Sequence, residues 1–168
     1  LEIIKQMFDC WTLFREMDDF QTVASVYREV VQIEMGYRGL DCSVSDVLLD
    51  TIESCLCIMG RRGIRPDDYK NFLTGINAIQ GHVFLGKING ENAGIMACEV
   101  MYLATCILTE QTSIKRISDV ESYRDVKLQM QGAKKISYIR NADPMAYAYL
   151  VESFVLIQSA GYFTESII

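Results

Sequence analysis

The sequence predicts an all-α fold: a single compact helical domain of about seven helices around a central apolar helix at residues 93–108. Only Glu99 and Thr105 are polar in that stretch, and a helix that is apolar nearly all round must be covered on every side. Elsewhere, apolar residues recur at the three- and four-residue spacing of a helix face. The chain has only two prolines in 168 residues, which favours long helices, and its length favours one domain over residues 1–168.

The first two predicted helices follow each other closely. Residues 1–17 form the first, because their apolar side chains fall on one helical face. The pair Asp18-Asp19 then offers an N-cap for a second helix that reaches about Met35. The predicted apolar face of this second helix consists of Phe20, Val23, Val26, Tyr27, Val30, Val31 and Ile33. Residues 36–42 are expected to form a loop that starts with a glycine.

The third and fourth predicted helices flank a loop that is rich in arginine. A serine, either Ser43 or Ser45, is expected to cap the third helix, which runs to Met59. The loop at residues 61–65 leads to Pro66, which we place in the first turn of the fourth helix. A proline at that position lacks only an N–H group that would have no helical partner, and the aspartates after it favour the helix dipole.

The second half of the chain contains two ambiguous stretches. We expect a helical extension or a turn at residues 82–90 rather than a short strand. A Ser-x-x-Glu capping-box pattern predicts a helix over residues 118–131. Residues 133–140 fit either a helix or a short strand. An Asp-Pro pair at residues 143–144 begins the last helix, which Gly161 ends.

The net charge of -6 argues against a protein that coats nucleic acid by bulk charge. The charge is unevenly distributed, however. Residues 113–140, called the basic segment below, contain seven basic and three acidic residues, so this segment carries +4 and the rest of the chain -10. The basic residues of the segment are Lys115, Arg116, Arg124, Lys127, Lys134, Lys135 and Arg140.

The sequence lacks the residue sets that most catalytic sites require. It has a single histidine, no glycine-rich phosphate loop, and no cysteine spacing typical of a zinc site. We therefore expect no cofactor and no metal, and an enzyme is disfavoured. The leading interpretation is a non-catalytic interaction or structural module that acts through helix faces, by binding a protein partner or by self-association.

Two alternative functions rest on particular charged residues. The first is binding of RNA, of phosphate or of an acidic protein partner by the basic segment together with Arg61, Arg62 and Arg65 of the arginine-rich loop. The second is a helical enzyme that uses Glu99 and Glu152 as inward-facing carboxylates. Because an unpaired buried carboxylate is costly, we expect these glutamates to pair with a basic residue or to lie at a solvent-facing helix edge.

Cysteine usage predicts the compartment. Five of the six cysteines lie in apolar helical patterns, where a free thiol behaves as a small apolar group. We therefore expect reduced thiols and an intracellular location, in the cytoplasm or the nucleus. The apolar stretch at residues 93–108 is shorter than the roughly 20 residues that cross a bilayer, so we predict a core helix and no membrane span.

Overall fold

The computed structural model describes residues 1–81, 88–130 and 132–162, and within these ranges it is all-helical, with no strand. Its α-helices are α1 (Glu2–Glu16), α2 (Phe20–Arg38), α3 (Val44–Gly60), α4 (Pro66–Ile79), α5 (Gly90–Leu108), α6 (Ala133–Ile136), α7 (Ile139–Ala142) and α8 (Pro144–Ser159). Two short 3₁₀ helices, η1 (Arg61–Gly63) and η2 (Glu121–Tyr123), complete the regular structure. The predicted all-α domain around a central helix is confirmed.

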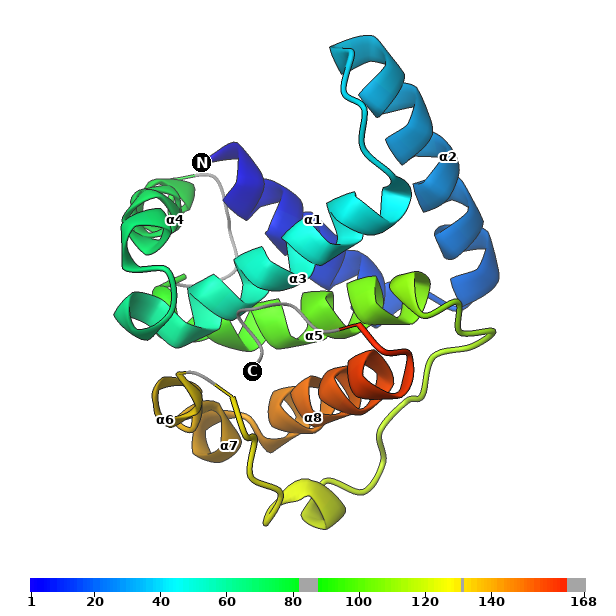
Figure 1. Cartoon of the computed structure of the whole chain (residues 1–168). Coiled ribbons are helices and arrows are strands. Elements are labelled where there is room, and N and C mark those ends of the chain that lie inside the picture. The colour runs from blue at the N-terminus through cyan, green and yellow to red at the C-terminus, as the bar shows by residue number, and fades with distance from the viewer. Residues whose placement is uncertain (82–87, 131, 163–168) are drawn as a thin grey trace.

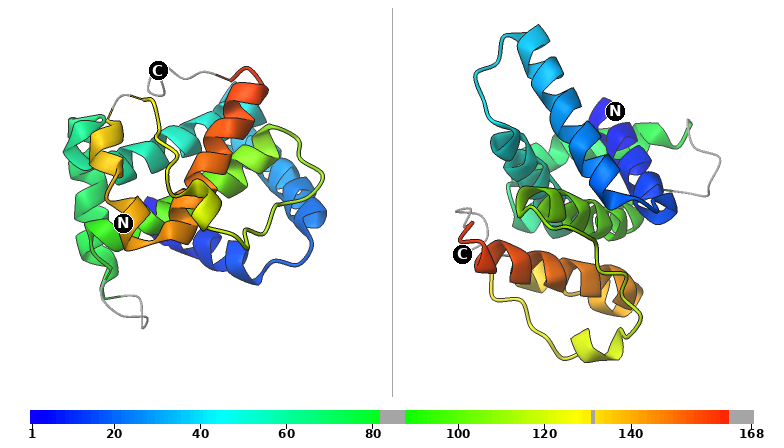
Figure 2. Two further views of the ribbon diagram at one scale, coloured as in Figure 1. Left: turned by 90° about the horizontal axis from the view of Figure 1, so that it is seen from below. Right: turned by 90° about the vertical axis from the view of Figure 1, so that its right-hand side faces the viewer.

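Helix α5 lies at the centre, with α1 and α3 on one side and α8 on the other (Figures 1 and 2). Phe14 of α1, Tyr102 of α5 and Tyr149 of α8 meet with ring centroids 4.9–6.1 Å apart, which joins the three helices through one aromatic cluster. Among the described helices, only α5 is long and apolar enough to cross a membrane, and 83% of that window is buried within the protein, as expected of a core helix.

The predicted helix starts are confirmed where a polar side chain caps them. The Asp19 carboxylate accepts a hydrogen bond from the Thr22 amide at 3.1 Å at the start of α2. Ser43, rather than Ser45, caps α3 and forms a reciprocal capping box with Asp46. Asp143 accepts from the Ala146 amide at 2.9 Å at the start of α8. These caps satisfy backbone donors that have no partner within the helix.

Two helices are longer than predicted. Helix α2 continues through Gly36 to Arg38, and Gly39 ends it with a left-handed φ of 63°, so the loop after α2 is shorter than expected. Helix α5 begins at Gly90, because the Asn89 side chain accepts hydrogen bonds from the two amides at residues 91 and 92. The expectation for residues 82–87 lies outside the described residues.

The helix predicted over residues 118–131 is wrong. Only η2 forms there, and the described remainder of the segment is turns and irregular backbone. Asp119 replaces the predicted serine cap: its side chain accepts from the Glu121 amide at 3.1 Å, which favours a tight turn. The ambiguous residues 133–140 form α6, a two-residue turn and the start of α7, and contain no strand.

Candidate functional surfaces

Glu99 has the arginine partner that the sequence led us to expect. Its carboxylate, only 2% exposed on α5, accepts two hydrogen bonds from the Arg15 guanidinium of α1, at 2.7 and 3.0 Å. The Arg15 guanidinium also stacks over the Trp11 ring, 4.4 Å from its centroid. The hydrogen bond to Glu99 raises the pKa of Arg15, and the two hydrogen bonds fasten α1 to α5.

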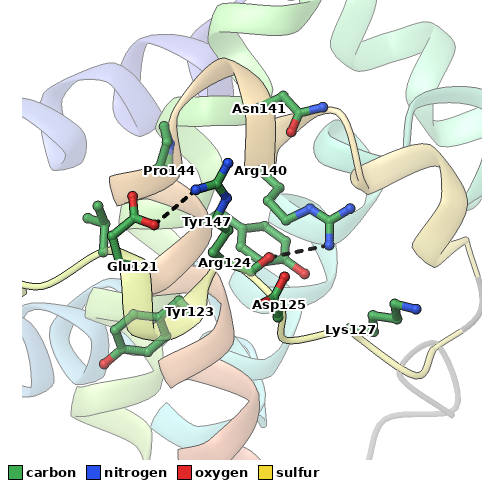
Figure 3. Close-up of a pocket in the computed structure, with 10 residues that line it drawn as sticks. Glu121, Tyr123, Arg124, Asp125, Lys127, Arg140, Asn141, Pro144 and Tyr147 are labelled. Atoms are coloured by element: carbon green, nitrogen blue, oxygen red, sulfur yellow. Dashed lines mark hydrogen bonds and ion pairs between the residues drawn. The ribbon is translucent and has the colours of Figure 1, made fainter.

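Glu152 of α8 binds a different cation. It accepts a hydrogen bond from Lys115 Nζ at 2.7 Å and another from the Tyr123 hydroxyl. Partial burial raises the pKa of Glu152, but these hydrogen bonds outweigh burial and leave the pKa below its ordinary value. Each glutamate of the enzyme hypothesis is therefore held in its own ion pair, and neither lines the pocket of Figure 3.

Two more of the predicted binding residues are engaged in contacts within the fold. Arg116 donates hydrogen bonds to the carbonyl oxygens of Phe14 and Met17, at 2.8 and 2.6 Å, and so covers the C-terminal end of α1. Arg65 forms ion pairs with Asp68 at 2.6 Å and with Glu53 at 3.4 Å. Arg116 and Arg65 therefore satisfy groups of the protein itself.

Arg124, Lys127 and Arg140 line a pocket of about 570 Å³ between the η2 region and the start of α8 (Figure 3). Acidic side chains share this pocket, and Arg124 forms an ion pair with Glu121 at 3.1 Å. Arg140 donates to the Arg124 carbonyl oxygen at 3.4 Å. The two acids, Glu121 and Asp125, offset much of the positive charge, so the pocket is mixed rather than strongly cationic.

The remaining cations of the predicted sites lie on two segments that contact each other. Arg61 and Arg62 belong to η1, Lys134 and Lys135 belong to α6, and the Lys135 side chain packs against Gly63 at the end of η1. We call these four residues the cation cluster. The structure thus divides the ten predicted binding residues into the cation cluster, the three in the mixed pocket, and three that hold the fold together.

The structure also shows an apolar surface on α2 that sequence analysis assigned to the core. Helix α2 projects from the body of the molecule (Figures 1 and 2), and only Phe20 and Ala24 on it are buried. Four large side chains, here called the α2 stripe, are at least half exposed: Val26 (52%), Val30 (50%), Ile33 (50%) and Tyr37 (83%). The prediction that Val26, Val30 and Ile33 share the packed face is wrong.

The reason lies in the two apolar stripes of α2. One consists of Phe20, Ala24, Tyr27, Val31 and Met35, which are buried or partly buried. At 100° per residue this stripe lies roughly 130° around the helix from the α2 stripe. Neighbouring helices cover only one of the two. The four-three-four spacing of the α2 stripe indicates a second apolar face in the sequence. No local pattern, however, predicts which of the two faces other helices will cover.

The described residues offer little for metal or nucleophile chemistry. They contain no group of three or more potential metal ligands, and His82 lies outside the described residues. All six cysteines are free, and four of them are buried. Burial raises the pKa of Cys57 to about 11 and that of Cys106 to about 12, so these thiols carry no thiolate at neutral pH.

Comparison of the chain with protein-family models, with curated proteins and with solved structures finds no match.

Proposed function

We propose that this domain is a non-catalytic, intracellular interaction module whose α2 stripe binds an amphipathic helix of another protein. The observation that carries the proposal is the exposure of four large apolar side chains along one face of a projecting helix. Contiguous apolar surface of this kind, rimmed by polar residues, is typical of sites where another protein binds. Apolar side chains at this spacing match the helix-in-groove and helix-on-helix modes of recognition.

The charges beside the α2 stripe indicate the chemistry of the partner. Glu29 and Glu34 are exposed and lie on opposite sides of the stripe on a helical projection. Arg28, by contrast, points inward and donates to the Ile107 carbonyl oxygen at 3.0 Å. A partner helix with basic residues beside its apolar face complements this rim. A second copy fits less well, because antiparallel packing of Val30 against Ile33 places the two Glu29 side chains on one edge of the interface and the two Glu34 side chains on the other, so like charges share each edge.

A designed peptide tests this proposal directly. The probe is an amphipathic helical peptide with a leucine face flanked by lysines, and its binding is measured by fluorescence anisotropy. The double variant Val30→Ser/Ile33→Ser keeps the net charge but removes two apolar contacts. Because half of each side chain is already covered, docking buries the rest, worth about 1 kcal/mol per residue. We expect the double variant to bind about 30-fold more weakly.

The matched control is Leu13→Ser/Val155→Ser, which removes two exposed apolar side chains from α1 and α8. It should bind the peptide as the unchanged protein does, and all three proteins should melt alike. Equal binding by the two double variants overturns the proposal, because the peptide then binds by charge alone. A dimer of the unchanged protein that Val30→Ser/Ile33→Ser abolishes, measured by light scattering, assigns the stripe to a second copy instead.

A further inference from the structure

The cation cluster joins two segments that are distant in the sequence. The absence of a side chain at Gly63 makes the contact possible, because a Cβ there lies 2.5 Å from Lys135 Cγ. Gly132, with a φ of 77°, packs against Ile64 in the same way. These two close approaches place the end of η1 against α6, so the two segments that carry the four cations are neighbours.

The cluster keeps its positive charge available. Within the described residues, none of its four cations forms an ion pair, whereas Lys115, Arg65 and Arg124 all do. The Arg61 guanidinium stacks over the Tyr138 ring, 4.2 Å from its centroid, and its Nε is buried without a hydrogen-bond partner. Arg62, Lys134 and Lys135 are exposed to solvent.

The backbone beneath the cluster is strained. Arg61 has a φ of 53° and a ψ of -133°, a conformation that suits glycine and is rare for a side chain as large as arginine. Residues held in such conformations concentrate at functional sites. Stacking on Tyr138 fixes the direction of the Arg61 side chain despite this strain.

We propose that the cation cluster binds the phosphates of single-stranded RNA, a second binding activity independent of the α2 stripe. Guanidinium and ammonium groups are the usual protein partners of phosphate oxygens. A flexible single strand can place several phosphates on a compact patch. A rigid duplex extends beyond the patch and brings further phosphates over a chain of net charge -6, which repels them.

Salt dependence of oligouridine binding tests the proposal. A short fluorescein-labelled oligouridine is titrated with the full chain at 50 and 200 mM salt. With four phosphate contacts, the affinity should fall about 50-fold between the two salt concentrations. The triple variant Arg62→Gln/Lys134→Gln/Lys135→Gln keeps one cluster cation, so its affinity should fall only about threefold over the same range. At 50 mM salt we expect the triple variant to bind at least tenfold more weakly than the unchanged protein.

The matched control, Lys5→Gln/Arg38→Gln/Lys70→Gln, removes three exposed cations that lie on α1, α2 and α4. Because the net charge of both triple variants is the same, only a local site separates them, and the control should keep its salt dependence. Absent binding at 50 mM salt, or equal losses in the two variants, overturns the proposal. So does tighter binding of polyglutamate than of oligouridine, which assigns the cluster to an acidic protein.

A competition experiment with inorganic phosphate at matched ionic strength separates a nucleic-acid strand from a single phosphate. Inorganic phosphate should compete only weakly with oligouridine, because a single phosphate engages only part of the cluster. Full competition overturns the assignment to a strand.

Discussion

Helices α2 and α5 have the same length, 19 residues, and opposite environments. Helix α5 is buried on every side beyond its first turn, including Glu99, whereas α2 buries two residues and leaves a row of apolar side chains exposed. Both helices are rich in apolar residues, so hydrophobicity alone does not set burial. The difference is that α5 has neighbours on all sides, while α2 has them on one side only (Figure 1). The covered helix forms the core, and the half-covered helix carries the apolar surface on which the proposed function rests.

The most severe test of this comparison is a charge reversal inside α5. In Glu99→Lys, an ammonium replaces the carboxylate that Arg15 binds, so two cations face each other in a buried site. We expect a loss of about 3–5 kcal/mol in the free energy of unfolding, measured by chemical denaturation. Glu99→Gln should cost much less, because Arg15 is 48% exposed and can turn toward water. Near-native stability of Glu99→Lys contradicts the position of α5 at the centre of the fold.

A pair of alanine substitutions measures the contrast between the two helices directly. Met101 on α5 is fully buried, so Met101→Ala leaves a cavity and should cost about 2–5 kcal/mol. Val30→Ala on the α2 stripe should change stability by less than about 0.5 kcal/mol, because half of the side chain is already in water. The denaturant midpoints of the two variants, compared with that of the unchanged protein, measure both losses of stability. Similar losses in both variants mean that the outer face of α2 is packed in solution.

The third test concerns the ion pair of Glu152, whose burial lies between that of Met101 and that of the α2 stripe. Because its pKa is lowered in the folded protein, the contribution of Glu152 to stability is fully present above the ordinary pKa of 4.5. That contribution disappears as the pH falls through the lower pKa of the folded state. Glu152→Gln should therefore cost about 1 kcal/mol at pH 7 and nothing at strongly acidic pH. A cost that is independent of pH shows that packing, and not charge, is what the substitution removes.

Much of the secondary structure followed from local patterns. The capping residues Asp19, Ser43 and Asp143 begin their helices as predicted, because a cap depends only on residues three or four positions away. The helix predicted from Ser118 does not form, because local signals compete there and contacts with a distant helix decide the outcome. The pattern was a valid local signal, but Asp119 supplies a competing turn, and Tyr123 and Lys115 are committed to Glu152 on α8.

The candidate surfaces were less accessible to sequence reasoning. Grouping by position along the chain placed Lys115, Arg116 and Lys134 in one basic segment, yet the structure assigns them to different environments. The link between the loop at residues 61–65 and the lysines of α6 depends on two glycines that allow close approach, Gly63 and Gly132. Glycine reads as a turn signal in a sequence, and its second role, making room for a distant side chain, is visible only in three dimensions.

The sequence by itself determined the all-helical class, the central position of the helix at residues 93–108, and the need of Glu99 for a partner. These follow from periodicity and from the cost of burying charge, which are properties of single segments. Only the tertiary structure decided that Arg15 is that partner, that the α2 stripe faces solvent, and that the η1 segment of Arg61 and Arg62 contacts the segment of Lys134 and Lys135. Each of these features depends on which faces of distant helices pack together. That packing is set by the burial of apolar area over the whole chain, and not by the pattern of any one segment.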